Sequence, residues 1–115
     1  MTDAFEEREK GFEAKYRIDT ELAFRTAIRR DKLFGRWAAE ALGLKGTRAD
    51  AYVEQLVALA IDTPGDDALI ASVLHDLQER SVDMTDGRLR IKLDKLHTEA
   101  REQVEAEAAE RRRRS

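Results

Sequence analysis

The sequence predicts an all-α protein: a compact antiparallel four-helix bundle with a mobile or partly helical N-terminal arm. Apolar residues make up 42% and charged residues 39% of the 115-residue chain, and aromatic residues are few, which is typical of amphipathic helices. One Pro and six Gly leave few breaks along the chain. Apolar residues return at helical spacing in four stretches joined by short connections, which favours antiparallel neighbours.

The first predicted helix begins near Asp19 and runs to Leu42, where Gly43 is expected to cap it. Two apolar residues of this helix, Phe24 and Ile28, point away from its main stripe. They indicate either a contact with the fourth helix or a docking patch. The main stripe is expected to pack in the core and comprises Leu22, Ala23, Leu33, Phe34, Trp37 and Ala41.

A second helix is expected to begin at Thr47, because Asp50 follows three residues later as in a capping box. The turn at residues 63–65 contains the single Pro and ends this helix. Asp66 and Asp67 then favour the start of a third, short helix that ends near residue 80. The two apolar stripes are Tyr52, Val53, Leu56, Leu59 and Ala60, and Leu69, Ile70, Val73, Leu74 and Leu77.

The fourth predicted helix has a narrow stripe and a basic end. Glu107 and Glu110 stand four residues before Arg111 and Arg114, a spacing that favours ion pairs along a helix. The bundle is therefore expected at residues 19–110, followed by a basic tail at residues 111–115. A solvated helix end is favoured for this tail over a docking site for an acidic partner or nucleic acid. The stripe comprises Leu89, Leu93, Leu96, Ala100 and Val104.

Residues 1–18 do not have the pattern of a core helix. On a helix, Phe5, Phe12 and Tyr16 fall within about 40° of one another, and most other residues of the segment are charged. Gly11 costs a helix about 1 kcal/mol relative to Ala. One interpretation is an arm that folds into a partner's groove, with the rings as anchors. The alternative is an extension of the first helix whose rings cover the bundle.

Composition excludes several classes of protein. The chain has no Cys, and hence no disulfide framework, thiolate metal site or cysteine nucleophile. The charged N-terminus and the lack of a long apolar run predict a cytoplasmic protein without direct membrane insertion. A net charge of −3, mixed in sign, does not favour nucleic acid as a partner.

No residue cluster indicates catalysis, so no enzymatic activity, cofactor or metal is expected. His75 and His97 lie on separate predicted helices and have no second His at ligand spacing. His75 could bind a metal weakly together with Asp76 and Glu79, but a solvated side chain on the helix surface is the favoured interpretation. The aspartates near Gly65 and Gly87 lack the ligand order of an EF-hand and are interpreted as helix caps, and residues 43–47 lack a phosphate-loop pattern.

Three longer stretches of the sequence are more specific indicators of a protein family than the short patterns above. Residues 5–16 read FEEREKGFEAKY, residues 19–24 read DTELAF, and residues 29–40 read RRDKLFGRWAAE. Together they resemble the ATPase inhibitor zeta subunit family of alphaproteobacterial F-type ATP synthases, and the similarity extends over nearly the whole chain. The chain departs from the family pattern at Tyr16, where Phe is usual, at Arg17-Ile18, where Ala-His is common, and at Asp31, where Asn is usual.

The resemblance implies a four-helix bundle, monomeric when free, whose arm inhibits the ATP synthase. The arm would enter the catalytic head between alpha and beta subunits, near the rotating gamma subunit, and block ATP hydrolysis more than synthesis. The protein would then lie at the inner membrane through the enzyme. The alternative is a helical adaptor that binds another cytosolic complex through the same arm. The expected contact residues are Phe5, Arg8, Lys10, Phe12, Glu13, Lys15 and Tyr16.

Overall fold

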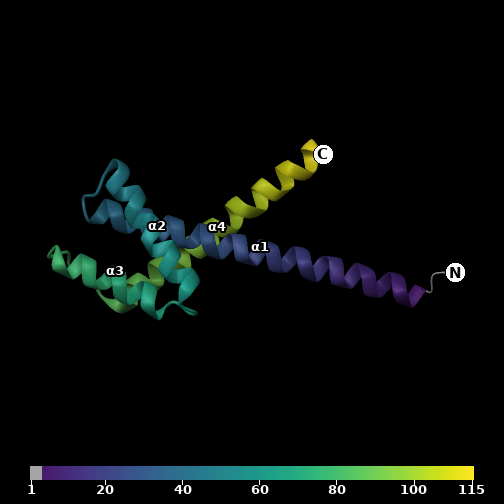
Figure 1. Cartoon of the computed structure of the whole chain (residues 1–115), viewed down its shortest axis with the longest axis horizontal. Helices are drawn as coiled ribbons and strands as arrows, with labels where there is room; N and C mark the ends of the chain where they lie inside the picture. The colour runs from purple at the N-terminus through teal and green to yellow at the C-terminus, as the bar shows by residue number, and fades with distance from the viewer. Residues whose placement is uncertain (1–3) are drawn as a thin grey trace.

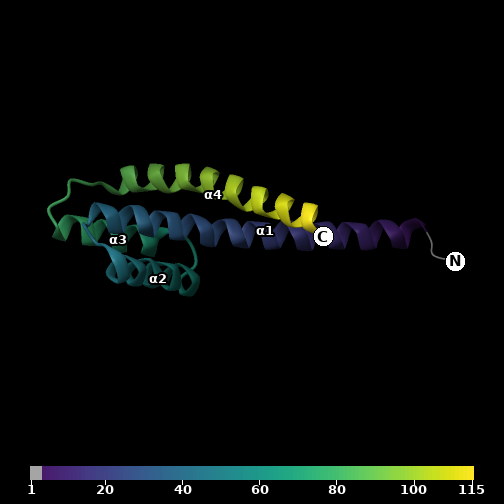
Figure 2. The ribbon, with the colours of Figure 1, turned by 90° about the horizontal axis from the view of Figure 1, so that it is seen from above.

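The computed structural model describes the backbone of residues 4–115 and the side chains of residues 13–115. Within the described residues, all regular secondary structure is α-helical. The helices are α1 (Ala4–Ala41), α2 (Gly46–Asp62), α3 (Asp67–Glu79) and α4 (Asp86–Arg114). Helices α1 and α4 run in opposite directions, and α2 and α3 pack against the C-terminal half of α1 (Figures 1 and 2). The predicted all-α fold is confirmed.

Helix α1 begins earlier than predicted. The expected start near Asp19 is wrong, because the helix runs without a break from Ala4 to Ala41. Its outer half contains no Pro, and local bonds support it: Thr20 Oγ1 donates to the Tyr16 carbonyl at 2.9 Å, and Arg25 pairs with Glu21 at 2.8 Å. A helix already nucleated in the bundle extends at low cost, since each added residue gains one hydrogen bond.

The core lies where α1 packs against the three shorter helices α2, α3 and α4. Phe34 on α1, Ile70 on α3 and Leu89 on α4 are fully buried there. The stripes predicted for α3 and α4 are confirmed, apart from the half-buried Leu74. The buried cluster comprises Phe34, Ala38, Leu42, Leu56, Leu69, Ile70, Val73, Leu77, Leu89, Leu93 and Leu96.

The predicted stripe of α1 is rotated relative to the buried face. Ala41 and Ala23 are exposed, whereas Ala38 and Ala39 are buried. Small residues line this face because α2 crosses α1 closely: a Cβ on Gly35 would lie 3.3 Å from the Cα of Val53. A search for bulky apolar residues therefore misses the face where the two backbones approach.

The cap of α1 is as predicted, whereas the cap of α2 is not. Gly43 has φ +76°, and the Leu44 amide donates to the Ala39 carbonyl at 2.9 Å, as in a Schellman motif. Helix α2 begins at Gly46 with Lys45 as its N-cap residue, and no side chain bonds that end. Thr47 thus lies inside the helix.

The basic tail belongs to helix α4. The helix begins after Thr85, whose Oγ1 accepts the Arg88 amide at 3.2 Å, and it continues to Arg114. The predicted pair of Glu110 with Arg114 forms, at 3.2 Å. Glu107 instead pairs with a residue of α1, as described below, because α4 crosses over α1 before its end diverges (Figure 1).

Candidate functional site

The outer half of α1 extends away from the bundle. The molecule measures 68 × 30 × 22 Å, and α1 projects beyond the other helices along the long axis (Figures 1 and 2). Every described side chain from residue 13 to residue 21 is exposed, and Leu22 is the first that is half-buried. We call residues 4–21 the α1 extension. Its described side chains are open to a partner over at least two helical turns.

The structure places part of the predicted contact set on this extension. Glu13, Lys15 and Tyr16 are exposed, with 68% of the Tyr16 surface accessible. Ile18 is 53% exposed on the same segment. The remaining predicted contacts lie outside the described side chains: Phe5, Arg8, Lys10 and Phe12. The alternative of rings covering the bundle does not hold for Tyr16.

The extension is held at its base by polar contacts between α1 and α4. Arg29 Nη1 lies 2.8 Å from Glu107 Oε1 and donates to Gln103 Oε1 at 3.0 Å. The hydrogen bond from Arg29 lowers the pKa of Glu107 below its usual value, against a smaller effect of desolvation. Thr26, one turn earlier, is 5% exposed. Packing against α4 thus fixes where the extension leaves the bundle.

A second arginine ties α1 to the start of α3. Arg30 Nη2 lies 2.9 Å from Asp31 Oδ1 and 2.8 Å from Asp66 Oδ1. Burial raises the pKa of Asp31, and the charge of Arg30 opposes this only in part. Burial tends to lower the pKa of Arg30, but its two carboxylate partners raise it overall. Asp66, expected to cap α3 with its side chain, serves this bridge instead.

Phe24 and Ile28 lie beside the fourth helix. Together with Arg29 they line a shallow groove whose other wall includes Val104 and Arg111 of α4. Phe24 nevertheless keeps 61% of its surface exposed. Of the two predicted alternatives, the contact with α4 is therefore present, and Phe24 also leaves an apolar surface next to the extension.

The two histidines lie apart on the helix surfaces. His75 is exposed, with its Nε2 3.7 Å from Glu79 Oε1 within α3. Asp76 accepts a hydrogen bond from the Tyr52 hydroxyl at 2.9 Å, which ties α2 to α3. Among the side chains that the structure describes, no group of three or more His, Cys, Asp and Glu could hold a metal ion. Asp76 thus has a structural role.

Sequence reasoning did not find several interhelical contacts. Arg29, Arg30 and Glu107 have the appearance of ordinary surface charges in the sequence, since their partners on other helices or loops lie 36 or more residues away. A signal was present for another group: Arg88, Lys92 and Lys95 follow the spacing i, i+4, i+7, which places three cations on one face of α4.

None of the helices, over the part of the chain that the structure describes, has the length and apolar character of a membrane span.

Comparisons with known proteins bear on most of the chain. A protein-family model described as ATPase inhibitor subunit zeta matches residues 1–103. Among curated proteins, no match to the chain is found.

Proposed function

The chain belongs to the ATPase inhibitor subunit zeta family, and from this premise we propose that its N-terminal arm, residues 1–18, blocks ATP hydrolysis by entering the catalytic head of the ATP synthase. Family membership supports an inhibitory, regulatory role and association with the ATP synthase. The arm is proposed to insert between alpha and beta subunits, close to the rotating gamma subunit.

One observation carries this proposal. The bundle provides no cover for the described part of the α1 extension, where residues 13–21 are all exposed and Tyr16 is 68% exposed. An exposed aromatic ring on a projecting helix is a suitable anchor for a partner's groove. Burial of one such ring contributes on the order of 1.5 to 3 kcal/mol to binding.

The continuous helix favours insertion in two ways. The segment from Ala4 to Ile18 lies within α1, and 15 residues of helix span about 22 Å, enough to reach into a subunit interface. A segment that is already helical loses less conformational entropy on binding than a coil, which costs about 1 to 2 kcal/mol per residue ordered. More of the contact energy is then available for inhibition.

Inhibition also requires discrimination between rotational states of the enzyme. A ligand with equal affinity for all states shifts no population among them. The arm must therefore bind one arrangement of the alpha, beta and gamma subunits much better than the next. The charged residues Glu13 and Lys15, both exposed, are proposed to contribute to this difference through ion pairs with the enzyme.

Deletion of residues 1–18 tests the proposal. We expect the shortened chain to lose inhibition of ATP hydrolysis by a matched, purified ATP synthase head, because the anchors are gone. The bundle should still give a helical circular dichroism spectrum and a cooperative unfolding transition. Deletion of residues 111–115 is the matched control and should leave inhibition unchanged. Full inhibition of ATP hydrolysis by the chain that lacks residues 1–18 would refute inhibition by insertion of the arm.

A further inference from the structure

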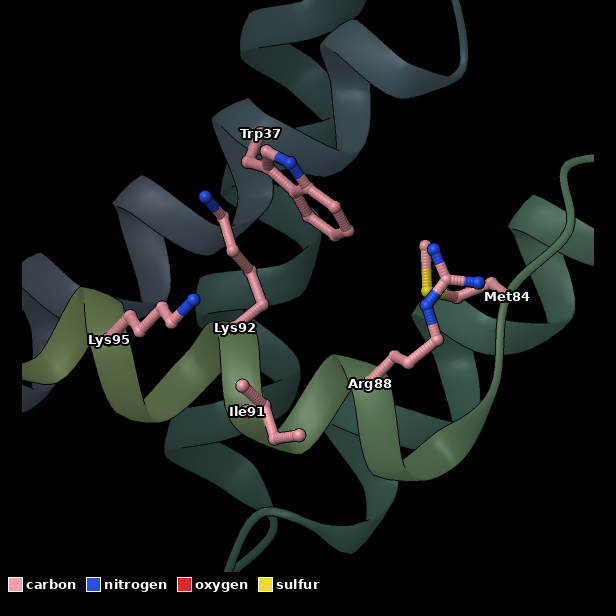
Figure 3. A pocket seen from close by; sticks show the side chains of 6 residues that line it. All are labelled: Trp37, Met84, Arg88, Ile91, Lys92 and Lys95. Atoms are coloured by element: carbon pink, nitrogen blue, oxygen red, sulfur yellow. The ribbon is translucent and has the colours of Figure 1, made fainter.

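An open groove lies at the far end of the bundle from the arm, between the C-terminal part of α1 and the beginning of α4. Its volume is about 260 Å³. Figure 3 shows its walls: the indole of α1 on one side and a row of α4 side chains on the other, with a methionine from the loop before α4. The lining residues are Trp37, Met84, Arg88, Ile91, Lys92 and Lys95.

The groove has a fixed apolar wall and an exposed apolar rim. Trp37 stacks on the buried Phe34 with ring centroids 5.9 Å apart, so the core holds the indole in place. Met84 is half-buried against the same core. Ile91 is 60% exposed and faces solvent at the rim. A ligand with a bulky apolar side chain would find a preformed surface here.

Positive charge surrounds this apolar surface. Lys92 Nζ lies 5.5 Å from the Trp37 ring centroid, and Arg88 Nη1 donates to the Asp83 carbonyl at 3.3 Å. The six lining side chains include three cations and no carboxylate. The groove therefore carries a local positive charge on a protein whose net charge is −3.

The neighbouring face of α4 differs. Arg90 Nε lies 2.7 Å from Asp86 Oδ1, and Arg90 Nη2 lies 2.9 Å from Asp67 Oδ1, so that cation is neutralised within the protein. The cations of the groove have no such carboxylates among the groove's lining residues. Charge complementarity therefore favours an acidic ligand, and the apolar wall favours one with a hydrophobic side chain.

We propose that the groove binds an acidic protein segment on the outside of the ATP synthase, through carboxylates near Arg88, Lys92 and Lys95 and one bulky apolar side chain against Trp37 and Ile91. This inference goes beyond the inhibitory arm. Trp37 lies 21 residues after Tyr16, about 31 Å along α1, so the groove can contact the enzyme outside the interface that holds the arm. A second contact raises the effective concentration of the arm at its site.

The test uses the full chain with Ile91→Glu or Lys95→Glu. Both side chains are exposed, so the fold should be retained, as judged by circular dichroism. We expect each variant to bind the purified ATP synthase head about tenfold more weakly, with a smaller dependence on salt for Lys95→Glu. Maximal inhibition at saturating concentration should be unchanged, since the arm is intact. Arg48→Glu, an exposed charge reversal on α2, is the matched control and should bind as the original chain does.

Several results would overturn the inference while leaving the proposed function standing. One is full affinity of both groove variants for the head. Another is that the original chain self-associates in analytical ultracentrifugation and the groove variants do not, which would assign the groove to a second copy of the chain. A third is that the variants bind anionic phospholipid vesicles or inorganic phosphate more weakly than the original chain but bind the head with the same affinity. The groove would then bind an anion of that kind and not a protein segment. Loss of maximal inhibition in the groove variants would also contradict it, because the groove would then act in the block itself.

Discussion

The two halves of helix α1 share one backbone conformation but differ in what covers them. Residues 13–21 are exposed throughout, whereas Phe34 and Ala38 in the second half are completely buried. In the second half, tertiary packing stabilises the helix. In the first half, the helix continues from a nucleus formed elsewhere, and its described side chains remain exposed to a partner. Helical structure alone therefore does not distinguish a core element from a binding element.

The largest expected effect is on stability. Phe34→Ala should lower the free energy of unfolding by about 3 to 5 kcal/mol, because it removes a fully buried ring and leaves a cavity. Tyr16→Ala on the same helix should change it by less than about 0.5 kcal/mol, because that ring is largely exposed. Urea unfolding followed by circular dichroism measures both. A large loss for Tyr16→Ala would mean that the ring packs in the free protein, and the contrast between the halves would fail.

The second effect is on inhibition. Tyr16→Ala should raise the concentration for half-maximal inhibition of ATP hydrolysis about tenfold, equivalent to about 1.4 kcal/mol. Phe24→Ala is the matched control, because that ring has similar exposure on the same helix but lies beside α4. It should shift the inhibition curve less than about twofold. The reverse ranking would move the docking surface from the extension to the bundle.

The third prediction concerns the carboxylate of the buried half. Burial raises the pKa of Asp31 above its usual value of 3.8, so the charged form destabilises the folded state relative to the unfolded chain. Asp31→Asn should therefore stabilise the protein at pH 7 by up to about 1 kcal/mol. The advantage should shrink as the pH falls through the raised pKa toward 3.8, because the original side chain becomes neutral. A variant that is clearly less stable at pH 7 would show that the Arg30 pair outweighs the cost of burial.

The smallest effect has the opposite sign. Arg29 lowers the pKa of Glu107 below its usual value of 4.5, so the charged form favours the folded state. Glu107→Gln should destabilise the protein slightly at neutral pH. The difference should vanish as the pH falls through the lowered pKa, because the original side chain then loses its charge as well. Thermal unfolding across pH 3 to 7 measures this, and an unchanged gap in acid would exclude the ion pair as the cause.

Much of the fold could be predicted from residue spacing. The stripe from Leu89 to Val104 has all five predicted residues buried, and the cap at Gly43 is as expected. The first helix was harder to predict in two respects. Its start was missed because a charged segment with a narrow apolar stripe does not indicate helix on its own, although a nucleated helix can extend through it. Its buried face differs from the predicted stripe because Gly35 is small and allows α2 to cross closely.

The candidate site was predictable only in part. The narrow stripe and dense charge identified residues 1–18 as a segment unlike core, and the exposure of Tyr16 agrees with this. Contacts between distant residues, such as Arg29 with Glu107, depend on how α4 crosses α1, and no local pattern encodes that angle. The spacing of the cations Arg88, Lys92 and Lys95 on α4 is visible in the sequence, but the indole of Trp37 that completes the groove comes from another helix.

The unbroken course of α1 links the number of residues before the bundle to the direction in which the extension presents its side chains. Each residue of an α-helix adds about 100° of rotation and 1.5 Å of length. A single insertion near Thr20 would therefore turn Tyr16 by more than a quarter of a circle relative to the bundle. An insertion of seven residues would nearly restore its direction while moving it outward by about 10 Å. A bundle and an extension joined in this way can change their spacing without changing their orientation only by insertions close to whole turns, such as about seven or about eleven residues.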